Sequence, residues 1–251
     1  LSAGLVACLA LMSAFFQAGT LLAVSKDSML LALADGFDFP VGKPDANNYR
    51  KARGFYPNHH VGEDWNGKGG GDTDKGDPIY SIGRGVVVLS EDIEKGWGNV
   101  VIVRHAFRDT DGAVRVVDSL YGHLLERKVK LYDKVERGQL VGTMGSNRGM
   151  YYAHLHFEIR KNLDIGMNRR KFKMDYSNYY SPTSFIKGHR KLSVGTRSYS
   201  VPVDTFEPYD VEAARKSFAA LPDAPIGVDI PLISEIKNRI ASQDKKKLGK
   251  D

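Results

Sequence analysis

The sequence predicts a mainly β domain, built from an antiparallel sheet or barrel with few helices. Short runs of β-branched residues recur along the middle of the chain, and glycine-rich connections separate them. The 26 glycines and 10 prolines favour many turns and therefore short strands. Hydrophobic residues make up 42% of the 251-residue chain, which is enough for one sizeable domain with extensions.

The first 34 residues are expected to form a signal peptide or a membrane anchor. Residues 3–24 are mainly apolar and uncharged, and the run is long enough to span a bilayer. Ala32-Leu33-Ala34 has the small-x-small form that a signal peptidase cleaves. Lipidation at Cys8 is an alternative, because residues 5–8 resemble a lipoprotein cleavage box. Export to the periplasm, cell envelope or extracellular space is therefore predicted, with membrane contact only through this segment if it is not cleaved.

Residues 35–190 are expected to form the compact domain. Five segments have strand composition or periodicity: 85–89, 99–105, 115–124, 135–142 (a turn and a strand) and 154–160. The last segment (HLHFEIR) alternates polar and apolar residues, so His154 and His156 should project from one face. The insert from Gly67 to Asp77 (GKGGGDTDKGD) is expected to be a surface loop. It lacks the Gly-Lys-Ser/Thr of a phosphate loop and the full ligand spacing of a calcium loop.

Residues 191–251 are expected to form a helical extension with a basic tail. The segment VEAARKSFAAL follows Asp210, which is a suitable helix cap. Further on, Leu232, Ile236 and Ile240 fall on one helical stripe. These helices are expected to belong to a tail of the domain rather than to bind a membrane or a partner.

Charge and cysteine content exclude several classes of function. The net charge of +6 favours anionic partners, but no nucleic-acid-binding motif accompanies it, so no nucleic-acid partner is predicted. The single cysteine, Cys8, lies in the leader, so the domain has no cysteine nucleophile, thiolate ligand or disulfide. The absence of a Gly-x-Ser-x-Gly elbow argues against a serine hydrolase.

Histidines form three local patterns that are compatible with a metal site. His60 and Asp64 are four residues apart, His123 lies in Tyr-Gly-His-Leu, and His154 and His156 are two residues apart. Zinc binds imidazole nitrogen and carboxylate oxygen, and a catalytic site keeps one position for water. The alternative interpretation is that these histidines are structural or surface residues.

Taken in order, these patterns resemble the lysostaphin-type zinc metallopeptidases, also called LytM-domain murein endopeptidases. The shared parts, within residues 37–160, are His60-x-Gly-x-Asp64, Gly96-Trp-Gly-Asn99, Tyr121-Gly-His123-Leu124, Gly138-Gln139 with Gly142, and His154-Leu-His156-Phe-Glu158. The resemblance implies a fold of the duplicated hybrid motif type and a Zn²⁺ ion held by His60, Asp64 and His156. It also implies that His123 and His154 flank the reaction centre. Three other histidines, His59, His105 and His189, are expected to lie outside the site.

The resemblance further implies hydrolysis of peptide cross-links or bridges of bacterial peptidoglycan, by a metal-activated water with a histidine base. One alternative is a catalytically inactive module of the same fold that activates another wall hydrolase; retention of all five site residues argues against it. A second alternative is a phosphohistidine carrier, and the leader argues against that. Glu158 shares strand parity with the two histidines, so it is expected either to orient an imidazole or to form a salt bridge on the sheet.

The chain departs from the family pattern just before the last motif. Where the family often has Gly-Ser-Thr-Gly, residues 145–152 read GSNRGMYY. These residues are expected to shape the substrate groove, so the specificity of other members does not carry over to this chain.

Overall fold

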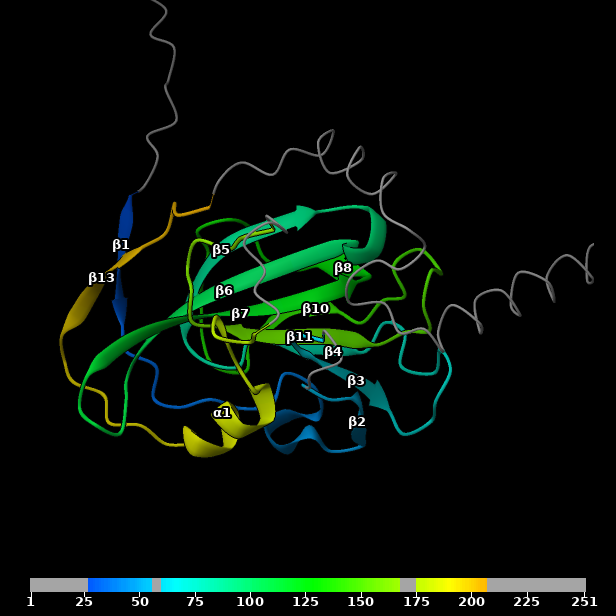
Figure 1. Ribbon diagram of the computed structural model, residues 1–251, viewed down its shortest axis with the longest axis horizontal. Helices are drawn as coiled ribbons and strands as arrows, with labels where there is room; N and C mark the ends of the chain where they lie inside the picture. The colour runs from blue at the N-terminus through cyan, green and yellow to red at the C-terminus, as the bar shows by residue number, and fades with distance from the viewer. Residues whose placement is uncertain (1–26, 56–59, 168–174, 207–251) are drawn as a thin grey trace, which may run out of the picture.

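The fold is built almost entirely from antiparallel strands (Figure 1). The structure is a computed structural model and describes residues 27–55, 60–167 and 175–206. The strands are β1 (Ser28–Ala32), β2 (Tyr49–Arg53), β3 (Glu63–Gly67), β4 (Pro78–Tyr80), β5 (Gly85–Asp92), β6 (Asn99–Arg108), β7 (Val114–Leu124), β8 (Glu126–Arg127), β9 (Lys134–Val135), β10 (Leu140–Thr143), β11 (Leu155–Arg160), β12 (Tyr179–Tyr180) and β13 (Ser198–Pro202). The helical segments are α1 (Pro182–Gly188) and the short turns η1 (Gly42–Ala46) and η2 (Lys95–Trp97).

The strands form three sheets. The largest has the order β2-β3-β11-β7-β6-β5-β9, with β12 paired to β11. A second sheet has the order β4-β10-β8, and β1 pairs with β13 in a two-stranded ribbon. Every strand pair is antiparallel, so the predicted mainly β, antiparallel fold with few helices is confirmed.

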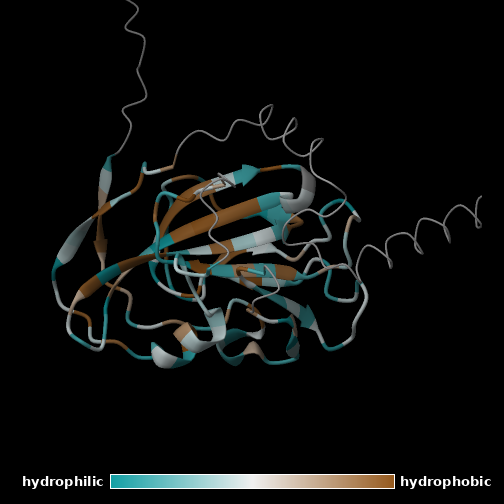
Figure 2. Ribbon diagram, viewed as in Figure 1, coloured by the Kyte–Doolittle hydropathy of each residue, from teal (hydrophilic) through white to brown (hydrophobic). Residues whose placement is uncertain are grey.

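The large sheet is buried on both faces because strand side chains alternate between them. On one face, Val87, Val103 and Tyr121 pack in a single apolar cluster with Ile79 of β4 and Val141 of β10. This cluster joins the large sheet to the three-stranded sheet. The hydropathy colours of Figure 2 show that β5 and β6 of the large sheet are largely hydrophobic.

A second apolar cluster covers the opposite face of the large sheet. It contains Val86, Ile102 and Leu120 together with Leu31 of β1 and Val201 of β13. The β1–β13 ribbon therefore closes a face of β5, β6 and β7 that would otherwise expose apolar side chains to water.

The strands predicted from β-branched composition are present, with shifted ends. The segment 85–89 extends to residue 92 in β5, and 99–105 extends to residue 108 in β6. The segment 135–142 divides between β9 and β10, whereas 154–160 begins one residue later, at Leu155, in β11. The ends moved because cross-strand pairing, rather than composition, decides where a ladder stops.

Two segments placed outside the predicted 35–190 domain form part of the described fold. β1 lies within residues 1–34 and pairs along its whole length with β13, which lies within residues 191–251. Residues 191–206 therefore contain a strand where a helical extension was expected. Cleavage after Ala34 would remove β1 and the buried side chains of Leu31 and Leu33. The helices expected after residue 210 lie outside the described residues.

Helix α1 closes the other side of the domain, below the large sheet in the view of Figure 1. Its Phe185 ring packs against Phe37 and Phe107, with ring centroids 5.0 and 5.5 Å away. Within residues 27–55, 60–167 and 175–206, no helix is long and apolar enough to cross a bilayer.

Candidate metal centre

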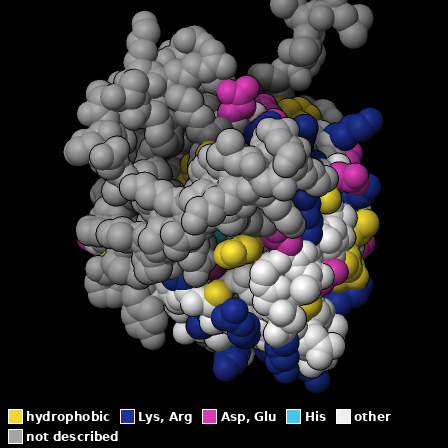
Figure 3. Space-filling model, turned by 90° about the vertical axis from the view of Figure 1, so that its right-hand side faces the viewer, with side chains coloured by type: hydrophobic (Ala, Val, Ile, Leu, Met, Phe, Trp, Pro, Cys, Tyr) yellow, Lys and Arg dark blue, Asp and Glu magenta, His cyan; other side chains and the backbone are white. Residues whose placement is uncertain are grey.

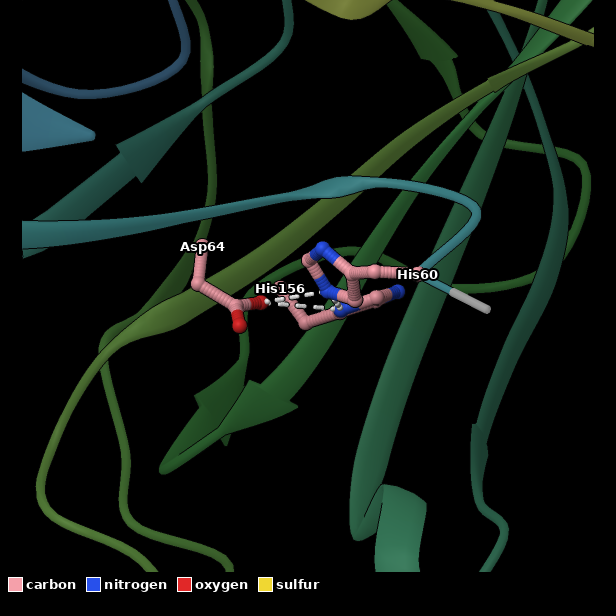
Figure 4. Close-up of side chains that lie close together, drawn as sticks. All are labelled: His60, Asp64 and His156. Atoms are coloured by element: carbon pink, nitrogen blue, oxygen red, sulfur yellow. Dashed lines mark hydrogen bonds and ion pairs between the residues drawn. The ribbon is translucent and has the colours of Figure 1, made fainter. Parts of the chain in front are cut away.

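Three side chains that can each offer a lone pair converge at one point: His60, Asp64 and His156 (Figure 4). Asp64 on β3 and His156 on β11 are direct partners across the antiparallel ladder. His60 lies three residues before the start of β3. The facing atoms are His60 Nε2, Asp64 Oδ1 and His156 Nδ1, and the three distances between them are 3.0 to 3.1 Å.

The far side of each imidazole is held by a hydrogen-bond acceptor. His60 Nδ1–H donates to the Gly54 carbonyl at 2.9 Å, and His156 Nε2–H donates to Glu158 Oε1 at 2.8 Å. In the neutral form of each ring the proton stays on this far nitrogen, and the other nitrogen can present its lone pair to the centre. Glu158 Oε2 also accepts from Arg160 Nε at 2.6 Å, but both side chains are buried, so this ion pair is not the predicted surface salt bridge and Glu158 instead contacts an imidazole.

Buried charges set the electrostatics of this cluster. Burial alone would raise the pKa of the Asp64 carboxyl, but hydrogen bonds from His156 and His60 hold it well below its usual range. Burial likewise opposes ionisation of Glu158, yet the Arg160 charge and the His156 bond lower its pKa to about 2. His156 is buried too, which favours its neutral form, but its bonds to the two carboxylates raise its pKa to about 9. The two carboxylates are therefore balanced by protonated His156 and by Arg160, and a metal cation would take the place of the His156 proton.

The donor set fits a zinc ion. Zinc bonds of about 2.0–2.1 Å in tetrahedral geometry place neighbouring ligand atoms about 3.3–3.4 Å apart. The ligand atoms of His60, Asp64 and His156 lie 3.0 to 3.1 Å apart, so a small outward shift accommodates the metal. Two imidazoles and one carboxylate leave a fourth position for water or substrate. Among the described residues, no other group of three His, Cys, Asp or Glu side chains comes this close together.

Gly62 has a steric reason to be the glycine of the His-x-Gly-x-Asp sequence. A Cβ atom there would lie 2.5 Å from the Phe157 carbonyl oxygen and 2.9 Å from Glu158 Cγ. Because real Cβ contacts are not this short, a larger residue would push β11 away and displace the ligand His156.

His123 and His154 lie beside the ligand cluster. Their ring centroids are 4.8 Å apart. His123 Nδ1–H donates to the Trp97 carbonyl at 3.1 Å, and His154 Nδ1–H donates to the Tyr152 carbonyl at 2.8 Å. Each neutral ring therefore keeps Nε2 as a proton acceptor. His154 Nε2 lies 4.0 Å from Asp64 Oδ1, which places this acceptor next to the ligand atoms.

The backbone of His123 is strained. Its φ is 60°, a left-handed conformation that costs a residue other than glycine on the order of 1 kcal/mol or more. Burial, together with the neighbouring His154 and His156, lowers the pKa of His123 well below its usual range. The Tyr151 ring lies 4.9 Å from the His123 ring, and Trp97 lies 6.3 Å from it on a stacked plane. His123 is therefore held as a neutral, desolvated imidazole.

Two of the three histidines predicted to lie outside the site are described, and both are remote from the ligands. His105 Nδ1–H donates to the Arg84 carbonyl at 2.9 Å, and burial lowers its pKa to about 4. His189 caps the end of α1 and bonds Asp109 at 3.2 Å. His59 lies outside the described residues.

Several contributors to the site were not singled out from the sequence. Arg160, which holds Glu158, has the same strand parity as His154 and His156, and that parity is a signal that the sequence contains. By contrast, Asn66 on β3 and Asp72 in the predicted surface loop contact the backbone of Ala153 through their side chains. No periodicity or short motif marks those two residues.

Two histidines and a carboxylate whose donor atoms converge, with two further histidines beside them on an antiparallel sheet, form a group that could hold a metal ion. The profile of Peptidase family M23 matches residues 60–168, which contain all five of these side chains. The chain belongs to this family, whose peptidases are zinc-dependent. The resemblance predicted from the motifs is therefore confirmed.

Three relatives each match about a third of this chain. Lipoprotein NlpD of Yersinia enterocolitica is 35% identical over 86 residues, which are 34% of this chain and 79% of that protein. Cell division protein DipM of Caulobacter vibrioides is 34% identical over 86 residues, and Peptidoglycan DD-endopeptidase ShyC of Vibrio cholerae is 34% identical over 87. The matched segments cover 34% and 35% of this chain but only 13% of DipM and 18% of ShyC.

Among solved structures, the chain is similar to the catalytic domain of lysostaphin from Staphylococcus simulans. The two are 29% identical, with a TM-score of 0.41, over 56% of this chain and 94% of that one. A zinc-containing peptidase from Vibrio cholerae is 27% identical, with a TM-score of 0.39, over 50% of this chain and 37% of that one.

Proposed function

We propose that this chain is a zinc-dependent endopeptidase that hydrolyses peptide cross-links or bridges of bacterial peptidoglycan. The observation that carries the proposal is the convergence of His60, Asp64 and His156, with His123 and His154 beside them. Two similar proteins, ShyC and ShyA of Vibrio cholerae, are named as peptidoglycan DD-endopeptidases, and a third, ALE-1 of Staphylococcus capitis, as a glycyl-glycine endopeptidase. The proposal covers the class of bond and leaves the choice between these bonds to experiment.

In this mechanism His60 Nε2, Asp64 Oδ1 and His156 Nδ1 hold the zinc ion. When bound, zinc supplies a Lewis acid for the scissile carbonyl and for the attacking water. Glu158 and the Gly54 carbonyl keep the two ligand imidazoles in the required tautomer and orientation. Arg160 keeps Glu158 ionised, so this carboxylate does not compete for the proton of His156.

His123 and His154 supply the proton transfers. Each presents an unprotonated Nε2, because its Nδ1–H is committed to a backbone carbonyl. One imidazole accepts the proton of the attacking water, and the resulting imidazolium donates to the leaving amine. The chain has no HExxH glutamate, so the base is a histidine. The second imidazole, with its ring centroid 4.8 Å from that of the first, would stabilise the negative charge on the carbonyl oxygen in the form that carries a proton on Nε2 as well as on Nδ1.

The proposed location is outside the cytoplasm, and the net charge of +6 suits an anionic wall polymer. Figure 3 shows Lys and Arg side chains on the described part of one face, interspersed with Asp and Glu. We propose that residues 35–190 hold the catalytic machinery and that the apolar segment before residue 27 directs export. Residues 27–34 then stay with the domain, because β1 pairs with β13 and buries Leu31.

A second candidate is an activator of another wall hydrolase. Murein hydrolase activator NlpD of Escherichia coli is 35% identical over 86 residues, which are 20% of that protein. The complete set of three ligands and two flanking histidines favours the peptidase, because an activator has no chemical need for it.

Cleavage of purified peptidoglycan tests the proposal. The full chain, with zinc, is incubated with peptidoglycan, and newly exposed amines and released muropeptides are measured. We expect amine release that stops with a chelator and returns when zinc is added, and the products name the bond. No amine release from a zinc-loaded chain that stimulates a second wall hydrolase would instead support the activator.

A further inference from the structure

His154 has less structural support than the other side chains of the site. It precedes β11, and its only strand-like pairing is an isolated bridge to Gly145, with an N–H···O distance of 3.2 Å. The ladder between β11 and β3 begins at Leu155, and that between β11 and β7 begins at His156. His154 is also outside the ligand group, so a metal bond does not hold it. Its imidazole is fixed through Tyr152, whose carbonyl accepts from Nδ1 at 2.8 Å. The position of this ring therefore depends on the backbone of residues 152–154.

Asn66, near the end of β3, and Asp72, in the polar insert that follows, hold that backbone at both polar groups of one residue, Ala153. Ala153 N–H donates to Asp72 Oδ1 at 2.8 Å, and Asn66 Nδ2 donates to the Ala153 carbonyl at 3.0 Å. The polar backbone groups of a fully buried residue are thus bonded to two side chains of residues 66–72. The bond to Asp72 is charge-assisted, which makes it stronger than a neutral one.

The insert is itself anchored, so it can act as a fixed support. Asp74, which is 3% exposed, accepts from Gly67 N–H at 2.7 Å and ties the two ends of the turn together. Gly76 N–H donates to the Met144 carbonyl and Met144 N–H donates to the Asp77 carbonyl, both at 2.8 Å. These bonds join the insert to the end of β10, on the side from which the chain approaches His154.

Two glycines of the insert, Gly70 and Gly71, are required by its backbone conformation. Gly70 and Gly71 have φ values of 71° and 57°, and nothing lies within 4 Å of a Cβ atom built on either. Glycine is therefore favoured at both positions because the backbone is left-handed there, and not because neighbouring atoms leave no room for a side chain. Consecutive left-handed residues return the chain sharply, so that Asp72 points back to Ala153.

We propose that Asp72 and Asn66 are positioning residues for His154, and that the insert of residues 67–77, together with Asn66 at the end of β3, serves as a brace for this histidine. The proposal rests on the proposed function for its kinetic consequence, but the bracing itself is a property of the fold. The brace sets the orientation of an imidazole that lacks both a ladder and a metal ligand role. Removing it should therefore change turnover without changing metal binding.

Substitutions of Asp72 in the full chain test this. With the peptidoglycan fragment that the wild type cleaves, Asp72→Ala should lower kcat at least tenfold, while KM and zinc affinity stay within about twofold. Asp72→Asn keeps an acceptor oxygen and should restore kcat to within about threefold. Lys75→Ala, which removes an exposed side chain of the same insert that takes no part in these bonds, is the matched control and should behave as the wild type.

A double-mutant comparison identifies His154 as the residue through which Asp72 acts. In a His154→Ala background, adding Asp72→Ala should produce no further loss of kcat, because the side chain that the brace positions is already absent. An equal loss in both backgrounds, or a loss of zinc affinity with Asp72→Ala, would overturn the proposal. Asn66→Ala provides a second, independent break of the brace if Asp72→Ala does not fold.

A readout that does not need catalysis separates this inference from the proposed function. In ¹⁵N spectra of the histidine rings, the slowly exchanging Nδ1–H signal of His154, assigned with His154→Ala, should weaken in Asp72→Ala and remain in Asp72→Asn. If the wild type cleaves nothing but this signal behaves as expected, the brace stands and the peptidase proposal fails. If the signal is unchanged in both Asp72→Ala and Asn66→Ala, the brace is wrong whatever the activity.

Discussion

The two halves of the site are held in place by different means. The ligands Asp64 and His156 lie opposite each other within a strand ladder, and His156 is backed by the buried ion pair of Glu158 and Arg160. The flanking pair, His123 and His154, lies at strand ends, and each ring depends on one backbone carbonyl.

Because different contacts hold the two pairs, we expect some substitutions to change metal binding and others to change only the rate of turnover. A substitution that disturbs the ligand half should reduce zinc affinity first and activity as a consequence. A substitution in the flanking half should leave zinc bound and reduce only the rate.

Removal of a ligand should have the largest effect. His156→Ala takes away one of three ligand atoms and leaves Asp64 and Glu158 without their buried partner, so we expect near-complete loss of bound zinc and of hydrolysis. Zinc per chain is measured by elemental analysis after dialysis. A variant that keeps about one zinc per chain would show that His156 is not a ligand.

Removal of a flanking histidine should abolish much of the rate but none of the metal. His154→Ala and His123→Ala should each lower kcat by about 10²–10⁴-fold, the usual contribution of a positioned acid or base. Zinc content should stay at the wild-type level in both. His189→Ala, remote from the site, serves as the control. If His154→Ala or His123→Ala lowered zinc content in parallel with kcat, the flanking histidines would not differ from the proposed ligands.

Replacement of the carboxylate behind His156 should have an intermediate effect. Glu158→Gln weakens the bond that orients the ligand ring, and we expect a 10–100-fold loss of zinc affinity, as for other groups that orient metal ligands. Glu63→Gln is a matched control. Glu63 is also a fully buried carboxylate, but it bonds Lys51, Trp65 and Thr183 rather than a ligand. Equal losses in the two variants would mean that burial of charge, not orientation, sets the affinity.

A change of one pH unit should have the smallest effect of the four on zinc affinity. The metal-free pKa of His156 is raised to about 9, so below that pH a proton occupies the ring that zinc requires. Zinc must displace this proton, and its apparent affinity should rise about tenfold per pH unit between pH 7 and 9 and then level off. Calorimetric titrations in buffers of different ionisation enthalpy measure the released proton. Affinity that does not change over this range would contradict the proposed competition.

The ligand half was accessible from the sequence because its information is local. His60 and Asp64 are four residues apart, and His156 and Glu158 share one strand parity, so short spacings already place these pairs together. The β-branched runs located β5, β6 and β7 for the same reason: a strand buried on both faces needs apolar residues in sequence.

The remainder depends on contacts between distant residues. Asp72 and Asn66 reach Ala153 across 81 and 87 positions, and a polar side chain in a glycine-rich insert carries no periodicity that would predict this. β1 is as apolar as residues 3–24, so composition alone grouped it with this N-terminal segment rather than with the domain. Its pairing with β13 is a tertiary contact that overrides the local pattern.

The central claim is that three residues bind the metal and two do not. Crystals of the full chain grown with zinc, with diffraction recorded at the zinc absorption edge, test it most directly. The account predicts one anomalous peak within bonding distance of His60 Nε2, Asp64 Oδ1 and His156 Nδ1, with neither His123 nor His154 coordinated. A peak bonded to His123 or His154 in place of one of these three atoms, or no peak at this point, would contradict it.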